Sequence, residues 1–291
     1  MIGVVGSLNL DLVARVPHLP AAGETVLGGT LAQHLGGKGG NQAVAAARLG
    51  AAVAFFGAVG EDAFGAELVA GLAAEGVDTA GVRRVPGASG CALINVADDG
   101  ENAISVLPGA NEHAPLPPLP WPAALRLLLM QLEVPLPTVA AWAAAARAAG
   151  VPVLLNAAPM AALPPVLLQA VDLLIVNEGE LQALGARNAA EAAARGPKSV
   201  VVTRGAHGVR AWHAGREWEQ RALAVPVADT TGAGDTFAGA LAAALWQQRP
   251  FGEALARATA AASLACTRVG ARAAMPTAAE LDTAIETMEP R

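Results

Sequence analysis

The chain has 291 residues, a formal net charge of −6 at pH 7, 54% hydrophobic residues and only 3% aromatic ones. This length allows one large α/β domain or two small ones, with a core built mostly from Ala, Val and Leu. The mildly acidic charge and the lack of any run of Lys or Arg argue against a nucleic-acid partner, but they leave room for a local pocket that binds small anions.

Neither a leader segment nor a membrane span is expected from the sequence. The first residues, MIGVVGSLNLDLVARV, carry no basic leader, and the apolar run at 125–132 is short beside the ~20 residues that cross a bilayer. Cys91 and Cys266 form no CxxC pair, so they predict no metal site, and a disulfide is not needed at this size. We expect a soluble, cytoplasmic protein that does not bind membranes.

Short apolar runs alternate with longer helical patterns along most of the chain. Strands are predicted at 2–7, 52–60, 125–132, 151–158, 172–177 and 199–205. Helices are predicted at 41–49, 63–75 and 136–149, and a helical stretch is expected after each of the last three strands. This alternation predicts a single α/β domain over 1–291, with a doubly wound, mostly parallel central sheet and helices on both faces. Such sheets bind ligands at the carboxyl ends of their strands.

Two segments depart from this rhythm and indicate antiparallel ribbon. They are 23–35 and 90–107, and the second contains CALINV and AISV around the turn DDGEN, which is typical of a hairpin. We expect a small accessory sheet, acting as a lid over the strand ends or as a dimer contact, with a plain edge hairpin as the alternative. The Pro-rich stretch 114–122 is predicted to be an extended connection back into the sheet.

The run DTTGAGDTFAGAL at 229–241 carries the strongest chemical signal. Gly232, Ala233 and Gly234 stand where a helix begins, so backbone N–H groups there are left unshielded by side chains. The helix dipole adds partial positive charge, which suits a phosphate or a developing oxyanion. Asp235 follows in the first turn and is a candidate base for a hydroxyl that attacks a phosphoryl group. The alternative for an isolated GAGD is a helix start stabilised by an acidic residue.

A second glycine-rich segment, LGGKGGNQAVAAARLG at 35–50, lets the backbone approach a ligand closely. Lys38 supplies a positive donor and Asn41 an amide that both donates and accepts hydrogen bonds. These groups suit a polyhydroxylated ligand, although a glycine-rich turn before a helix is common in other settings.

With GGKGGNQA near its beginning and DTTGAGDTF near its end, the chain resembles the ribokinase-like carbohydrate kinase family. The resemblance runs from GSLNLD at 6–11 to CTRVGA at 266–271, in the family's order. It implies a doubly wound sheet with a smaller β lid, formed here by segments near 10–35 and 90–107, that covers a sugar. The one departure noted is Gly40, where many relatives carry Ala.

The resemblance also implies residue roles on the sugar side. Asp235 is the expected catalytic base, and the turn of Gly232, Ala233 and Gly234 is the expected anion site. The expected sugar contacts are Asn9, Asp11, Gly37, Lys38, Asn41, Asp235 and Glu133, the last from the segment LLLMQLE. Asp11 is suited to accept from two adjacent hydroxyls; the plainer interpretations are a turn cap for Asp11 and a solvated strand end for Glu133.

On the nucleotide side, the resemblance implies ATP and Mg²⁺. Asn177 and Glu180, in VNEGE, resemble the family's NxxE motif and are expected to organise Mg²⁺ and its waters, the alternative being an ordinary helix start. The expected ATP contacts are Thr203, Gly205, Gly208, Gly234 and Thr259, and His207 is expected to be exposed and not catalytic. The loop pair expected to hold K⁺, largely through backbone carbonyls, contains Asp229, Thr231, Ala265, Arg268 and Gly270.

Together these features predict ATP-dependent phosphorylation of the primary hydroxyl of a sugar, with ribose favoured because NxD, GGKGGNQ and MQLE occur together. Deoxyribose, fructose or a nucleoside are alternatives, and the scarcity of aromatic residues argues mildly against a nucleoside. A non-catalytic sugar-binding regulator is a further alternative, whereas a Rossmann dehydrogenase is rejected because GxGxxG is absent after the first strand. A homodimer through the exposed lid face is expected.

Overall fold

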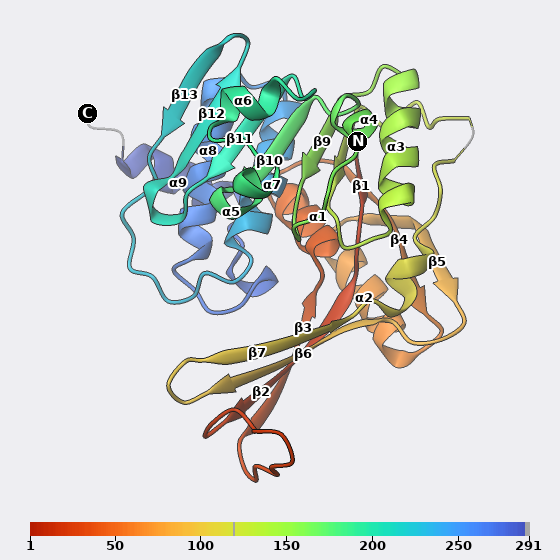
Figure 1. The fold of residues 1–291 in the computed structure, drawn as a ribbon, viewed down its shortest axis with the longest axis vertical. Coiled ribbons are helices and arrows are strands. Elements are labelled where there is room, and N and C mark those ends of the chain that lie inside the picture. Colours follow the sequence, from red (N-terminus) through yellow and green to blue (C-terminus); the bar gives the residue numbers. More distant parts are fainter. Residues whose placement is uncertain (119, 289–291) are drawn as a thin grey trace.

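The computed structural model describes residues 1–118 and 120–288 (Figure 1). Its larger sheet has nine strands in the order β13-β12-β11-β10-β9-β8-β1-β4-β5. The strands are β1 Ile2–Val5, β4 Val53–Gly60, β5 Asp78–Val85, β8 Leu127–Met130, β9 Val153–Asn156, β10 Leu173–Asn177, β11 Ser199–Thr203, β12 Val209–His213 and β13 Arg216–Gln220. All neighbours from β5 to β11 pair in parallel. The predicted mostly parallel sheet is therefore confirmed.

One edge of this sheet differs from the prediction. No helix of the parallel rhythm follows β11; the 3-10 turn η2, Gly205–His207, leads instead into β12 and β13, which pair antiparallel. Gly208 makes this possible, because its φ is +81° and a Cβ there would lie 2.1 Å from the carbonyl oxygen of Gln220. The sequence analysis also missed β5 at the opposite edge.

Helices cover both faces of the large sheet (Figure 1). One core cluster joins the sheet to α1 Lys38–Arg48, α2 Ala63–Ala74, α7 Ala233–Trp246, α8 Phe251–Ala265 and α9 Ala278–Met288. The other joins it to α3 Leu136–Ala148, α4 Pro165–Leu168, α5 Glu178–Ala183 and α6 Ala189–Ala193. Strand β8 shows how side chains alternate between these cores, since Leu127 and Leu129 belong to the first and Leu128 and Met130 to the second. No helix within the described residues is long and apolar enough to cross a bilayer.

A separate four-stranded sheet, called the small sheet below, projects from the large one (Figure 1). Its strands, in the order β3-β2-β6-β7, are β2 Asn9–Val16, β3 Thr30–Gly36, β6 Gly90–Ala97 and β7 Asn102–Leu107. The predicted hairpin at 90–107 is confirmed as β6 and β7, paired antiparallel. The ribbon predicted for 23–35 is wrong at its start, because 23–29 forms no strand and β3 pairs with β2 instead.

Three further connections lie between these elements. The 3-10 turns η1 and η3 span Gly109–His113 and Arg272–Ala274. The described residues of the Pro-rich connection at 114–122 form no helix or strand, as predicted, but residue 119 within it lies outside the described residues.

Candidate active site

Polar side chains gather where the parallel strands of the large sheet end. Ser7 and Asn9 follow β1, Glu133 follows β8, Asn177 ends β10 and Thr203 ends β11. Carboxyl ends of parallel strands meet at one edge of a sheet, which is the usual place for a ligand in this architecture. Residues that are far apart in the sequence thus share one site.

Helix α7 begins at this edge with an unshielded turn. Its N-cap is Gly232, in the left-handed region at φ +75°, and no acceptor in the described part of the chain meets the amides of Gly234 and Asp235. The amide of Ala233 instead donates to the carbonyl oxygen of Thr230 at 3.2 Å. A Cβ at Gly234 would meet nothing within 4 Å, so the space beside this turn is open. Such a helix start attracts anions.

Asp235 is buried beside that turn, with 6% of its surface exposed, and two amides hold its carboxylate. Asn41 donates through Nδ2 to Oδ2 at 3.0 Å, and Gln42 donates through Nε2 to Oδ1 at 3.0 Å. Gln131 in turn donates through Nε2 to Oε1 of Gln42 at 2.7 Å, and Gln42 Nε2 also lies 3.0 Å from Asn156 Oδ1. Each carboxylate oxygen accepts one bond and retains a lone pair for an incoming hydroxyl.

The sequence analysis did not select Gln42, Gln131 or Asn156. Gln42 is part of GGKGGNQA, so its motif was recognised without its role. Gln131 lies within the quoted segment LLLMQLE, and only its contact with Gln42 shows that it supports Asp235. Asn156 lies within the strand predicted at 151–158 and carried no further signal; in the structure it is the last residue of β9.

Asn9 and Asp11 lie on β2, at the junction of the two sheets. Asn9 Oδ1 accepts from Nδ2 of Asn111 at 2.7 Å, and Asn111 Oδ1 accepts from the amide of Leu8 at 2.9 Å, so an unpredicted residue of η1 fixes the Asn9 side chain. Burial is the main cause that raises the pKa of Asp11 to about 6, and the charge of the neighbouring Glu133 contributes to this rise. A Cβ at Gly36 would lie 2.2 Å from Asp11 Oδ2, so only glycine leaves space for this carboxylate.

Lys38 and Glu133 link the sugar motifs to the start of α1. Glu133 Oε2 accepts from Ser7 Oγ at 2.5 Å and from the amide of Lys38 at 2.9 Å. Gly37 permits this approach, because its φ is +82° and a Cβ there would lie 2.8 Å from the amide of Asn9. The negative charge of Asp235 is the main cause that raises the pKa of the Lys38 ammonium group. Lys38 therefore stays protonated beside the candidate base.

Asn177 and Glu180 form a reciprocal cap at the start of α5. Asn177 Oδ1 accepts from the amide of Glu180 at 2.8 Å, and Glu180 Oε2 accepts from the amide of Asn177 at 2.8 Å. Burial raises the pKa of the Glu180 carboxyl group, while the amide of Asn177 and the charge of Lys38 oppose that rise. These contacts are those of an ordinary helix start, the alternative given above. Glu180 Oε1 accepts no hydrogen bond from the described residues and could still face a hydrated Mg²⁺.

The remaining nucleotide candidates fall into two groups. Thr203 ends β11, where its Oγ1 donates to the carbonyl oxygen of Val176 at 3.3 Å, Gly205 begins η2, and His207 is exposed as predicted. Thr259 is buried within α8, where its hydroxyl donates to the carbonyl oxygen of Leu255 at 2.8 Å. Its side chain is therefore occupied inside the helix.

The two loops expected to hold K⁺ do lie against each other. Asp229 Oδ2 accepts from the amide of Gly270 at 2.8 Å, and its Oδ1 accepts from the amide and hydroxyl of Thr231 at 2.9 and 2.7 Å. Ala265 is buried, and the Arg268 guanidinium pairs with Glu280 at 2.5 Å, which leaves only its backbone for an ion. Within the described residues, no cluster of three His, Cys, Asp or Glu side chains could hold a metal, so any ion here needs backbone, water or phosphate oxygens.

Comparison with known proteins identifies the family. A model of the pfkB family of carbohydrate kinases matches residues 1–278. The ribokinase of Haemophilus influenzae is 39% identical over 292 residues, which cover 95% of each chain. The ribokinase of Bacillus subtilis is 38% identical over 285 residues, which cover 96% of this chain and 97% of that one. The chain belongs to the pfkB family of carbohydrate kinases.

Solved structures confirm the ribokinase-like fold. The ribokinase of Thermotoga maritima superposes with a TM-score of 0.91 at 32% identity, covering 98% of this chain and 99% of that one. The ribokinase of Arabidopsis thaliana, solved with ribose and ATP, gives a TM-score of 0.89 at 33% identity and covers 98% of each chain. The resemblance inferred from GGKGGNQA and DTTGAGDTF is therefore confirmed.

Proposed function

We propose that this protein transfers the γ-phosphoryl group of ATP to the primary hydroxyl of D-ribose, giving D-ribose 5-phosphate. The observation that carries the proposal is Asp235, a buried carboxylate held by two amides beside a helix start with two free N–H donors. The relatives named ribokinase, including one solved with ribose and ATP, support ribose and ATP as the substrates.

The chemistry follows from the contacts of Asp235. Its ionised carboxylate accepts the proton of the sugar hydroxyl as that oxygen attacks the γ-phosphorus, and the bond to the β-phosphate oxygen breaks as ADP leaves. The amides of Gly234 and Asp235 and the Lys38 ammonium stabilise negative charge on the transferring group. Asn9, Asp11, Lys38 and Asn41 hold the sugar so that donor and acceptor stay in line.

The small sheet fits the role of a lid over this site. Its strand β2 carries Asn9 and Asp11, and its strand β3 leads directly into α1 at Lys38. A lid that closes over the sugar would exclude water, which competes with the sugar as phosphoryl acceptor.

Two cations fit the residues present. Asn177 and Glu180 would hold the waters of Mg²⁺, which neutralises phosphate charge when it is bound with ATP. The backbone of the loops at 229–231 and 265–270 would hold K⁺, which would keep the start of α7 ordered. The hydrogen bonds that join the two loops, from the Gly270 amide to Asp229 Oδ2 and from the Ala228 amide to the Cys266 carbonyl oxygen, support this assignment.

The decisive test is ATP consumption with ribose, 2-deoxyribose, fructose and adenosine, each with and without K⁺. We expect the highest kcat/KM with ribose, ribose 5-phosphate as product, and a lower kcat without K⁺. A clear preference for 2-deoxyribose would move the assignment toward the deoxyribokinase of Salmonella typhi, which is 32% identical to this chain. No turnover of any acceptor would overturn the proposal.

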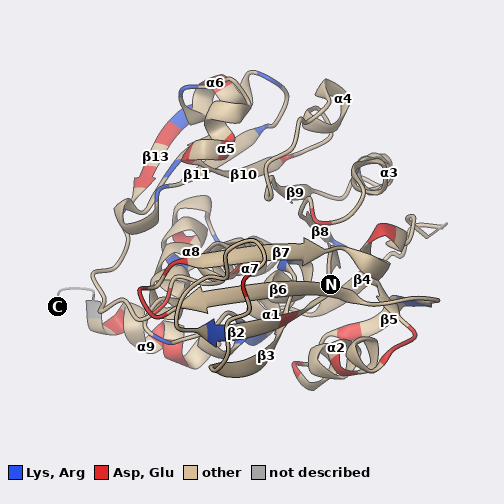
Figure 2. Cartoon of the chain, turned by 60° about the horizontal axis from the view of Figure 1, so that its bottom comes forward, with Lys and Arg blue, Asp and Glu red and all other residues tan. Residues whose placement is uncertain are grey.

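We also propose a homodimer through the small sheet. Exposed apolar side chains stand on three of its strands: Leu31, Leu93, Ile104, Val106 and Leu107, each at least 44% exposed. Strands β6 and β7 carry no charged residue, as their uncoloured ribbons show (Figure 2). By strand register Leu31, Leu93 and Leu107 share the face opposite Asp11, and a second copy would cover that face, since apolar patches favour association. Light scattering should give twice the 29.1 kDa chain mass, and a purely monomeric protein would contradict the proposal.

A further inference from the structure

Arg272, at the start of η3, is a buried arginine that the reaction described above does not use. Only 7% of its surface is exposed. Its Nε donates to Asn41 Oδ1 at 3.0 Å, and its Nη2 donates to the carbonyl oxygen of Gly36 at 2.7 Å. Gly36 is the last residue of β3, and Asn41 lies in the first turn of α1. One guanidinium thus ties the C-terminal segment to the junction of the small sheet with α1.

The contact with Asn41 fixes which way that amide points. An Asn side chain carries an acceptor oxygen and a donor nitrogen that exchange places when the amide turns over. Because Oδ1 accepts from Arg272, Nδ2 is directed at Asp235 Oδ2. The reversed amide would aim its oxygen at the carboxylate and its N–H group at the guanidinium, and both contacts would be lost.

We propose that Arg272 is a positioning residue for phosphoryl transfer, which holds the Asn41 amide in the orientation that donates to Asp235. This inference rests on the proposed kinase function. Arg272 does not touch the reacting atoms; it reaches the base through Asn41, while it also donates to the Gly36 carbonyl and its charge opposes the raised pKa of Asp11. Loss of the guanidinium therefore removes one of the two contacts that orient the amide, and the donor from Asn41 to the base is held less firmly than the one from Gln42.

The structure accommodates this guanidinium at a cost. Nη1 is buried without a hydrogen-bond partner in the described chain, and burial lowers the pKa of Arg272 to about 10. A Cβ at Gly40 would lie 2.1 Å from Nη2, so the glycine in GGKGGNQA provides the necessary space. A neutral side chain would pack here with less loss of solvation. The guanidinium, however, carries several donors and reaches Asn41 and Gly36 at the same time, which a neutral apolar side chain cannot do.

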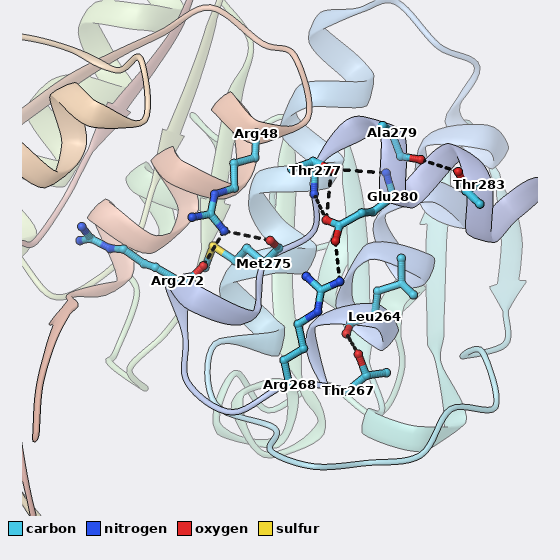
Figure 3. A network of polar contacts seen from close by, with 10 residues as sticks. All are labelled: Arg48, Leu264, Thr267, Arg268, Arg272, Met275, Thr277, Ala279, Glu280 and Thr283. Atoms are coloured by element: carbon cyan, nitrogen blue, oxygen red, sulfur yellow. Dashed lines mark hydrogen bonds and ion pairs between the residues drawn. The ribbon is translucent and has the colours of Figure 1, made fainter.

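The backbone of Arg272 is held independently of its side chain. Arg48 donates through Nη1 to the carbonyl oxygens of Arg272 and Met275 at 2.7 and 2.9 Å. Figure 3 shows this clamp, with the Arg272 side chain pointing away from it and away from the Arg268–Glu280 pair. Replacement of the side chain therefore leaves the anchoring of η3 in place.

A double-mutant cycle in kcat tests the inference with the variants Arg272→Met, Asn41→Ala and both together. Arg272→Met should lower kcat on the order of 10- to 100-fold, the scale of a misplaced catalytic contact, while KM for ATP stays within about 2-fold. If Arg272 acts through Asn41, the double variant should have a kcat within about 3-fold of Asn41→Ala alone. If the fold-losses in kcat of the two single variants multiply in the double variant, the inference is overturned, because independent structural effects combine in that way.

The matched control is Arg257→Met, which removes another arginine tied to the C-terminal segment, through Asp282 at 2.6 Å. It should leave kcat within about 2-fold of the wild type. If Arg272→Met does not fold, Arg272→Lys replaces it in the cycle, since one ammonium cannot reproduce the fork of donors. A wild type that phosphorylates no sugar overturns the proposed function together with this inference, whereas an active wild type with multiplying losses overturns this inference alone.

Discussion

Asn41 Nδ2 donates to Asp235 Oδ2 at 3.0 Å and joins two residues that are 194 positions apart. This bond joins the two glycine-rich motifs, at 35–50 and 229–241, into one site. Helices α1 and α7 approach closely enough for it because of Gly239, where a Cβ would lie 2.5 Å from the carbonyl oxygen of Gln42 and 2.6 Å from Ala45 Cβ. The same packing brings Gln42 to the other carboxylate oxygen.

Removal of the base gives the first prediction. Asp235→Asn should lower kcat by roughly 10²–10⁴, the usual contribution of a general base. The fold should persist, because an amide of equal size occupies the same buried space. Steady-state kinetics on ribose, with the melting temperature as a check on folding, measures this. Turnover near that of the wild type would contradict the assignment of Asp235.

The open turn at the start of α7 gives the second prediction. Gly234→Ala and Gly234→Val place side chains where a Cβ meets no protein atom, so stability should change by less than about 1 kcal/mol for Ala. Both shield the free N–H donors from a phosphoryl group. We expect kcat to fall with side-chain size, by on the order of 10-fold or more for Val. If the wild type and both Gly234 variants have equal kcat and KM, this turn is not an anion site.

Asp11 connects activity to pH. Its pKa is raised to about 6, mainly by burial, with Glu133 and Asp235 adding to the rise and Arg272 opposing it. If ionised Asp11 accepts two sugar hydroxyls, as proposed, KM for ribose in the wild type should rise as pH falls through about 6. Asp11→Asn should have a higher KM at pH 7.5, by about 10-fold, and should lack this dependence. A parallel pH dependence in both proteins would exclude Asp11 as its source.

The same pKa shift predicts that Asp11→Asn weakens ribose binding but stabilises the fold. Because the folded pKa of Asp11 lies above the ordinary value of 3.8, the stabilisation from its protonated form is complete below 3.8 and is lost as pH rises through about 6. Asp11→Asn should therefore be more stable than the wild type at pH 7.5, on the order of 2 kcal/mol. Denaturant unfolding at pH 7.5 and at pH 4 checks that this gain shrinks in acid. A gain of equal size at both pH values would point to another cause.

Much of the fold could be predicted because the parallel strands are local apolar runs bounded by Gly or Pro. The edge of the sheet could not be, because β12 and β13 carry alternating polar residues such as Arg210 and Glu219, whose cross-strand pairing depends on the turn at Gly208. Strand β5 was missed for a similar reason, since half of its sequence DTAGVRRV is polar and half of its residues are exposed.

The catalytic motifs were visible from the sequence, but the residues that position them were not. Asp235 stands in a long and specific run, whereas Arg272 stands in a segment with no polar pattern. Arg272 meets Asn41 across 231 positions, and local spacing contains no information about such a contact. Asn111 is similar, because only the fold brings η1 to Asn9. Long-range hydrogen bonds between buried side chains therefore needed the structure.

The last prediction concerns Arg48, which holds α1, α2 and η3 together. It pairs with Glu75 through Nη2 at 2.5 Å and Nε at 2.8 Å, and both side chains are mostly shielded, at 22% and 26% exposure. Arg48→Met leaves Glu75 and the Met275 carbonyl oxygen without their donor and leaves the Arg272 carbonyl oxygen with the Met275 amide alone, so the free energy of unfolding should fall by about 2 kcal/mol at pH 7.

The pH dependence of this loss in unfolding free energy separates the ion pair with Glu75 from the hydrogen bonds to the carbonyl oxygens. The hydrogen bonds from Arg48 hold the pKa of Glu75 below its ordinary 4.5, so this stabilisation is present above 4.5 and is lost as pH falls through the lower folded value. The bonds from Arg48 to the carbonyl oxygens of Arg272 and Met275 do not titrate. Denaturant unfolding should therefore show the difference between the wild type and Arg48→Met narrowing, but not vanishing, between pH 7 and pH 3. Glu75→Gln, as the control, should lose less at pH 7 because it keeps an acceptor for Arg48. A difference that stays constant over this range would show that the ion pair contributes nothing.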